Sequence, residues 1–293
     1  MAQADRRAAR IERALIGALT RAGGPGAPPR LAEALGYAVF PGGARVRPHL
    51  CLAVAAACGD DAPALSEATA AAVELLHCAS LAHDDLPCFD DAATRRGRPS
   101  VHAAFTPALA VLAGDALIVL AFETLARAAG AQPERLPALT IAVAKAVGAP
   151  SGLAAGQAWE SEPRIDRCAY HQAKTGALFV AAVTGGAIAA GADPAPWAPV
   201  GQRLGEAYQV ADDLLDALAT TAEAGKPIAQ DQGHDRPSAV RELGVEGAAR
   251  RLEDLIEAAR AAVPPCRGAA SLRELVRLQA TRLVPKSLAL TAA

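Results

Sequence analysis

Two clusters of aspartates, each set within apolar helix-forming sequence, constrain the fold of this chain more than any other feature. The first cluster holds Asp84 and Asp85 and, after four spacer residues, Asp90 and Asp91. Pro87 lies between the pairs and ends any helix that carries the first pair. Because a helix C-terminus already presents about half a negative charge, two aspartates there call for a nearby cation.

The second cluster lies far downstream and holds Asp212, Asp213 and Asp216. Asp212 and Asp216 are four residues apart, so on a helix their carboxylates share one face and repel unless something positive lies between them. Dense carboxylate oxygens suit a hard cation such as Mg²⁺, which keeps several waters and shares its shell with substrate phosphates. Together the clusters predict one polynuclear metal site between facing helices.

Basic residues accompany both clusters. Arg95 and Arg96 follow the first cluster, and arginine is the fork-shaped donor that grips phosphates. Arg45 and Arg47 follow a glycine-rich turn into a helix start, which is a natural anion site. Lys174 has apolar neighbours, where a cation is costly unless it meets an anion. Taken alone, the two arginine pairs also fit solvated surface charges.

The composition predicts an all-α protein in a single domain, 1–293. Hydrophobic residues make up 52% of the chain and aromatics only 3%, alanine is abundant, and alternating β-branched patterns are hard to find. The net charge of −2 gives no basic footprint, which excludes a nucleic-acid partner. Predicted helices cover approximately residues 4–21, a short stretch ending near 35, 48–57, 65–85, 108–129, 136–147, 152–160, 166–190, 195–218, 245–262 and 272–283.

Targeting and redox features predict a cytoplasmic protein. The six cysteines are scattered without a CxxC pair, which is typical of small buried side chains in a reducing compartment. Charges occupy the N-terminal stretch where a signal peptide needs apolar residues. The most apolar segment, residues 108–122, is broken by Asp115 and short for a membrane span. We therefore expect it to be a buried core helix, with no stable membrane insertion.

Six motifs occur in an order that resembles the trans-isoprenyl diphosphate synthase (polyprenyl synthetase) family over nearly the whole chain. They are GGARVRP at 42–48, HDDLPCFDDAATRRGRP at 83–99, GQAWE at 156–160, KTGAL at 174–178, YQVADDLLD at 208–216 and GKPIAQD at 225–231. The resemblance implies an antiparallel helical bundle around a deep central cavity, and a homodimer. Within the family, the pattern is most similar to short-chain geranylgeranyl diphosphate synthases that feed carotenoid pathways.

The resemblance also implies a reaction. An allylic diphosphate (dimethylallyl, geranyl or farnesyl) ionises, the double bond of isopentenyl diphosphate attacks the cation, and a proton is lost. About three Mg²⁺ ions would assist, as shared metal–phosphate shells allow. Their implied ligands are Asp84, Asp85, Asp90, Glu160, Asp212 and Asp216. The implied catalytic residues are Asp84, Asp85, Asp90, Arg95, Lys174, Asp212 and Lys226.

The same resemblance assigns the diphosphate contacts. Those to the allylic substrate are Arg95, Lys174, Thr175, Gln209 and Lys226. Those to isopentenyl diphosphate are Arg47, His77 and Arg96, with Arg45 as an added contact. His77 lies two helical turns before Asp84, in phase with it, although a lone histidine in an apolar helix is more often a core residue.

Three residues depart from the family pattern. Ala44 replaces a lysine of the glycine turn, which removes one positive contact to isopentenyl diphosphate unless Arg45 compensates. Glu160 replaces an aspartate and is one methylene longer, so it would reach a metal through water. Gln230 replaces a second lysine of the GK loop. Because both aspartate clusters are intact, we expect an active enzyme.

Product length depends on the volume beneath the first aspartate helix. In the family, the residue five positions before the first aspartate forms a floor, and here that residue is Ala79, followed by Ser80. Alanine leaves room for a C20 product, geranylgeranyl diphosphate, whereas an aromatic residue favours C15. A C15 farnesyl diphosphate synthase and a non-catalytic regulatory partner subunit stay as alternatives. A class I terpene cyclase is disfavoured, because such enzymes steer cations with aromatic rings and this chain has few.

Overall fold

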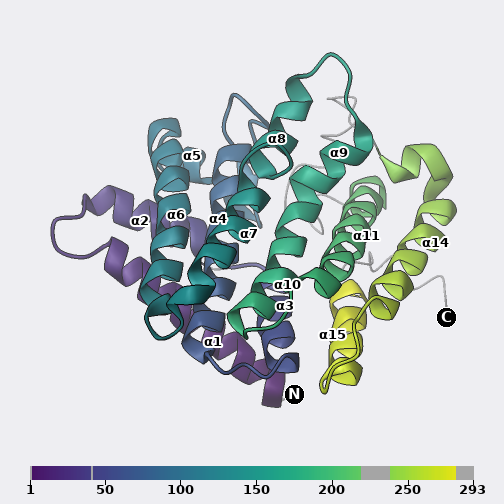
Figure 1. The fold of residues 1–293 in the computed structure, drawn as a ribbon. Helices are drawn as coiled ribbons and strands as arrows, with labels where there is room; N and C mark the ends of the chain where they lie inside the picture. The colour runs from purple at the N-terminus through teal and green to yellow at the C-terminus, as the bar shows by residue number, and fades with distance from the viewer. Residues whose placement is uncertain (1, 41, 219–237, 282–293) are drawn as a thin grey trace. The chain divides into compact units, whose positions relative to one another are not determined.

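The computed structural model describes residues 2–40, 42–218 and 238–281, and its regular structure is almost entirely helical (Figure 1). The predicted all-α class is confirmed, with one short hairpin as the exception within the described residues. The chain forms two compact units, residues 1–141 with 185–192 and residues 142–184 with 193–293. The single domain, 1–293, expected from the sequence stays a prediction.

The first unit is built around α4, which packs on both α3 and α6. Its inner faces are small or branched side chains, such as Ala71, Val73 and Leu75, all fully buried. Small residues allow helix axes to approach closely. The elements are α1 (Ala2–Ala22), α2 (Pro29–Val39), α3 (Val46–Ala57), α4 (Pro63–Asp84), β1 (Thr94–Arg95), β2 (Arg98–Pro99), α5 (Val101–Ala104) and α6 (Pro107–Ala128).

Helix α6 buries one face and exposes the other, so the expectation of a buried core helix is only half correct. Ala113 and Leu117 are fully buried, whereas Val111, Leu112 and Val119 are 40%, 53% and 66% exposed. The segment Pro107–Ala131 is long and apolar enough to cross a membrane by length and composition, and 44% of its most apolar 18-residue stretch is buried. An exposed apolar face of this kind is typical of an interaction surface.

The second unit contains the helices that carry the later motifs. α7 (Leu136–Val147) and α10 (Ala177–Ala189) run across the boundary between the two units. The predicted helix 166–190 divides into α9 (Arg167–His171), a π-helical turn (Gln172–Gly176) and α10. The other helices are α8 (Leu153–Ala158), α11 (Ala198–Leu218), α14 (Ala239–Ala261) and α15 (Ala269–Thr281).

Helices α11 and α14 form the core of the second unit. Leu214 on α11 and Leu252 and Leu255 on α14 belong to one buried apolar cluster. Helix α14 begins at Ala239, earlier than the predicted start at 245, but Gly244 interrupts it with a φ of +67°. Glycine adopts this left-handed conformation without steric cost, so the predicted start coincides with a real break.

Candidate active site

The first aspartate pair lies at the end of α4, as Pro87 predicts. Asp84 is the last helical residue and Asp85 occupies the C-cap. The chain then folds back on the helix end, because the Asp90 N–H donates to Asp84 O at 3.0 Å and the Ala92 N–H donates to Asp85 O at 3.1 Å. This return brings Asp90 close enough to Asp85 for its charge to raise the Asp85 pKa. Three of the predicted metal ligands therefore gather in the first unit.

Arg95 neutralises this pair from the hairpin that follows. The β1–β2 turn is made by Arg96 and Gly97, both with positive φ, as in tight two-residue hairpins. The Arg95 Nε donates to Asp85 Oδ1 at 2.9 Å, and its Nη2 lies 3.9 Å from Asp84 Oδ2. Asp85 is only 2% exposed, so burial raises its pKa while Arg95 lowers it. The hairpin is thus the element that brings an arginine to the aspartates.

The predicted isopentenyl diphosphate contacts also gather in the first unit. His77 lies on α4, Arg47 in the first turn of α3 and Arg96 in the hairpin turn. The pKa of His77 lies well below 6.5 because the half-buried imidazole is desolvated, and because the positive charges of Arg47 and Arg96 lie near it. His77 is therefore neutral at neutral pH, and it sits in a strongly positive environment.

Arg45 differs from these residues. It is 6% exposed, and its guanidinium donates to Glu12, Glu74 and the Val39 carbonyl. These partners are all protein groups, which favours a structural role over the added substrate contact that the sequence suggested. Its direct contact with isopentenyl diphosphate stays untested.

Ala79 and Ser80 lie on α4 beneath the first aspartates. Ala79 is 1% exposed and Ser80 is half-buried, with its Oγ donating to His77 O at 2.8 Å. The serine hydroxyl is therefore held against its own helix instead of projecting away from it. Both side chains are small, as the predicted C20 floor requires.

In the second unit, Glu160 and Lys174 form a cluster with a residue that the sequence analysis missed. Lys174 Nζ pairs with Glu160 Oε1, and the Tyr170 hydroxyl donates to the same oxygen at 2.8 Å. Gln157 Nε2 donates to Glu160 Oε2 at 3.1 Å. Tyr170 lies four residues before Lys174, a helical spacing that was the available signal. The metal role of Glu160 and the phosphate role of Lys174 remain predictions, and each would require this ion pair to change partners.

The second aspartate cluster separates into two kinds of residue. Asp213 is 3% exposed, and its oxygens accept from Gln209 Nε2 at 3.0 Å and from the Ala239 N–H at 2.6 Å. Thr175 Oγ1 in turn donates to Gln209 Oε1 at 2.8 Å. Asp213 therefore anchors the start of α14, an assignment that the sequence analysis missed.

Asp212 and Asp216, the predicted metal ligands of this cluster, are half-buried and lie one turn apart on α11. Gln209 and Thr175, predicted to bind the allylic diphosphate, are brought together by their hydrogen bond. Lys226 and Gln230 lie outside the described residues, so their predicted roles are untested.

The comparisons with known proteins agree with this arrangement of motifs. Residues 28–268 match the polyprenyl synthetase family, and the chain belongs to that family of prenyl-chain-elongating transferases. It is 59% identical to a geranylgeranyl diphosphate synthase of Cereibacter sphaeroides, over 96% of this chain and 97% of that protein. It is 52% identical to a geranylgeranyl diphosphate synthase of Rhodobacter capsulatus, over 94% and 95% of the two chains.

Among solved structures, the chain resembles a geranyltransferase from Helicobacter pylori complexed with magnesium and isoprenyl diphosphate. The TM-score is 0.82, the sequence identity is 28%, and the match covers 95% of this chain and 97% of that one. The fold is therefore that of the prenyltransferase structures, and the predicted fold class and prenyltransferase activity are confirmed.

Proposed function

We propose that this enzyme makes geranylgeranyl diphosphate by condensing isopentenyl diphosphate with dimethylallyl, geranyl or farnesyl diphosphate. The observation that carries the C20 product is the small, buried Ala79 five residues before Asp84, with the small Ser80 beside it. The two synthases that are 59% and 52% identical to this chain bear the same product in their names. Carotenoid or related isoprenoid synthesis would use this product.

The donor set fits Mg²⁺. Asp84, Asp85 and Asp90 offer hard carboxylate oxygens at one helix end, and Asp212 and Asp216 offer another pair. Within the described part of the chain, no three Asp, Glu, His or Cys side chains form a ready-made metal cage. Mg²⁺ fits such open sites, because it keeps waters and takes further oxygens from substrate phosphates. We therefore assign these five aspartates, with Glu160 through water, to about three Mg²⁺ ions.

The residues around the metal would bind and orient the two substrates. Bound Mg²⁺ supplies the positive charge that stabilises the departing diphosphate as the allylic carbon–oxygen bond breaks. Arg95 and Lys174, with Thr175 and Gln209, would hold the allylic diphosphate.

Arg47 and Arg96 would bind isopentenyl diphosphate through their two guanidinium groups. The neutral His77 would add one hydrogen bond without further charge. The double bond of isopentenyl diphosphate then attacks the allylic cation, and the proton lost from the adduct goes to the departing diphosphate.

We also propose that the enzyme acts as a cytoplasmic homodimer. Val111, Leu112 and Val119 form an exposed apolar stripe on α6. Asp115 lies on the same helix with a side chain 60% exposed, which disfavours a lipid environment and favours a second protein copy. All six cysteines are free thiols, which fits a reducing compartment.

The test is product length with purified protein, Mg²⁺, labelled isopentenyl diphosphate and each allylic primer in turn. We expect C20 product, lost on chelation or in Asp84→Asn. The variant Ala79→Phe should shift the main product to C15, because the aromatic ring fills the space below the aspartates. Wild-type products that stop at C15 with dimethylallyl and geranyl diphosphate, with no elongation of farnesyl diphosphate, would reject the cavity argument and favour the farnesyl alternative. Absence of any condensation would favour the partner-subunit alternative.

A further inference from the structure

The backbone of the glycine-rich turn is strained at Arg45. This residue lies immediately before α3 with φ of 50° and ψ of 36°, a left-handed conformation that is unfavourable for a side chain with a Cβ. A non-glycine residue keeps such a conformation only when its surroundings hold it there. Contacts of the Arg45 side chain must therefore stabilise this backbone conformation.

Three different elements hold the Arg45 guanidinium. Its Nε donates to Glu12 of α1 at 2.9 Å, its Nη1 to Glu74 of α4 at 2.7 Å, and its Nη2 to the Val39 carbonyl at the end of α2 at 2.9 Å. Glu74 is 2% exposed, so its charge depends on Arg45 for compensation. Arg45 thus ties the glycine-rich turn to three helices at once.

The two glycines of the turn pack directly on guanidinium groups. A Cβ on Gly42 would overlap the Arg45 guanidinium, and a Cβ on Gly43 would lie 3.0 Å from Arg96 Cζ. The backbone of the turn therefore lies against Arg45 at one glycine and against Arg96 at the next. Because both guanidinium groups pack on the same short stretch of backbone, a change in the position of Arg45 would shift the position of Arg96.

Arg45 also starts α3. The His49 N–H donates to Arg45 O at 3.0 Å, which is the first main-chain bond of that helix. Arg47 lies in this first turn and is 7% exposed, so its direction follows from where the helix begins. Glu74, which anchors Arg45, lies one helical turn before His77 on α4.

We propose that Arg45 is a positioning residue for isopentenyl diphosphate, acting through Arg47, Arg96 and His77 without touching the substrate. This inference rests on the proposed function, because it concerns the same substrate site. In chemical terms, the buried Arg45 guanidinium donates to two carboxylates and one carbonyl. These bonds fix the geometry of the glycine-rich turn, which lies next to residues that bind the diphosphate.

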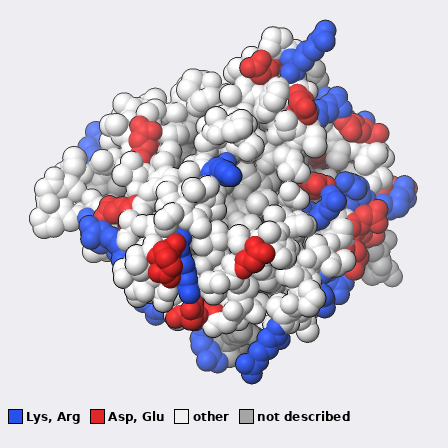
Figure 2. Space-filling view, viewed as in Figure 1, with Lys and Arg blue, Asp and Glu red and all other residues white. Residues whose placement is uncertain are grey.

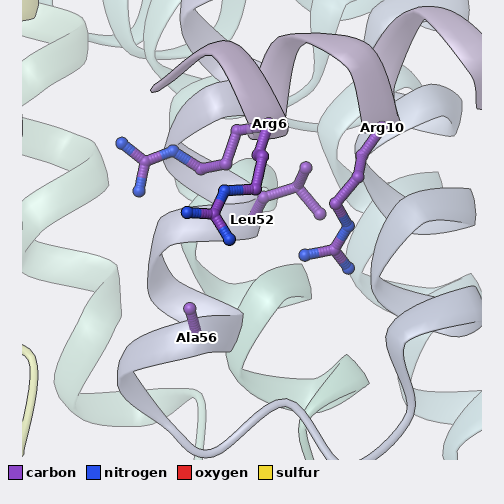
Figure 3. A pocket seen from close by; sticks show the side chains of 5 residues that line it. Arg6, Arg10, Leu52 and Ala56 are labelled. Carbon is purple, nitrogen blue, oxygen red and sulfur yellow. The ribbon is translucent and has the colours of Figure 1, made fainter. Parts of the chain in front are cut away.

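Arg10 supplies a matched control in the same unit. It also links α1 to the region of α4, with its Nε 2.8 Å from Glu67 and its Nη2 3.2 Å from Asp60. Figure 3 shows it beside a separate pocket of about 430 Å³, which Arg6, Arg7, Leu52 and Ala56 also line. None of these residues belongs to the glycine-rich turn, so loss of Arg10 removes two ion pairs, more exposed than the Arg45–Glu74 pair, without touching that turn.

The experiment compares Arg45→Met with Arg10→Met in steady-state kinetics, after the wild type has been shown to condense both substrates. We expect Arg45→Met to raise KM for isopentenyl diphosphate about tenfold, with KM for farnesyl diphosphate and kcat changed less than about threefold. Arg10→Met should leave all three constants within about twofold. Equal effects of the two variants on KM for isopentenyl diphosphate would overturn the proposal.

Glu12→Gln separates positioning from direct contact, and it also serves if Arg45→Met does not fold. Glu12 is 40% exposed, so its replacement is a milder change. If Arg45 bound the diphosphate itself, removing a competing carboxylate would lower KM for isopentenyl diphosphate. If Arg45 only positions the turn, the same change should raise that KM by about two- to threefold. A lowered KM would therefore reject positioning. Failure of the wild type to condense the substrates would instead reject the proposed function.

Discussion

Gly156 is the point where α8 touches the π-helical turn, and Gly156→Ala tests whether this contact aligns the second half of the site. A Cβ on Gly156 would lie 2.6 Å from Lys174 Cα and 2.8 Å from Lys174 Cβ. Carbon atoms normally approach to about 3.5–4.0 Å, so α8 has to retreat by about 1 Å. Because Glu160 follows on the same segment, its contact with Lys174 would be disturbed.

The magnitude follows from two opposing terms. Overpacking against backbone costs about 1–3 kcal/mol, and replacing a helical glycine with alanine returns up to about 1 kcal/mol. We therefore expect a net loss of about 1–2 kcal/mol in the free energy of unfolding. A displacement of about 1 Å near catalytic groups reduces rates by up to about a hundredfold, so kcat/KM should fall by roughly ten- to a hundredfold.

The assay combines urea unfolding followed by circular dichroism with steady-state kinetics. Gly36→Ala is the control, because Gly36 lies within α2 and a Cβ there would meet nothing within 4 Å. That variant should gain stability by up to about 1 kcal/mol and keep its activity. Our reasoning about the contact is refuted if Gly156→Ala is as stable and as active as Gly36→Ala.

Three further predictions concern the first unit. The half-buried His77 has a lowered pKa in the folded protein, so below about pH 6.5 only the unfolded chain gains its proton. Between pH 7.5 and 5.5 the wild type should therefore lose about 1.4 kcal/mol more unfolding free energy than His77→Gln. Equal losses in urea titrations would contradict this. Ala44→Lys restores the lysine of the family pattern at an exposed position. It should lower KM for isopentenyl diphosphate by about ten- to a hundredfold, since a charge-assisted hydrogen bond contributes about 1.5–3 kcal/mol. An unchanged KM would indicate that the lost lysine is already compensated. Iodoacetamide should label the exposed Cys88 and spare Cys78, whose pKa burial raises to about 12; equal labelling of the native protein by mass spectrometry would refute the burial of Cys78.

The helical frame was largely predictable because its signals are local. The proline after the first aspartates fixed the end of α4, and α7 matches its predicted bounds of 136–147. The sequence also contains nearly equal numbers of basic and acidic residues, 29 and 31, and both kinds occur on the face drawn in Figure 2. Such features depend on neighbouring residues and overall composition, which the sequence displays directly.

The parts that escaped prediction depend on contacts between distant segments. Spacing in the sequence separates Asp213 from Asp212 and Asp216, but only its bond from the N–H of Ala239 shows that Asp213 anchors α14. Arg45 looks like a substrate contact until Glu12 and Glu74 are seen to surround it. Partners brought together by tertiary folding leave no local pattern, so sequence reasoning identifies such residues as important without identifying what they do.

The π-helical turn at Gln172–Gly176 has a consequence for how this family member can change in length. A π-helical turn holds one residue more than an α-helical turn. The wider turn absorbs its extra residue, so deleting one residue there would restore a regular helix while α9 and α10 keep nearly the same rotational phase. One residue added or removed between Tyr170 and the π-helical turn would instead rotate Tyr170 by about 100° relative to α10 and turn it away from Glu160. Length changes near Lys174 should therefore survive best within the π-helical turn itself.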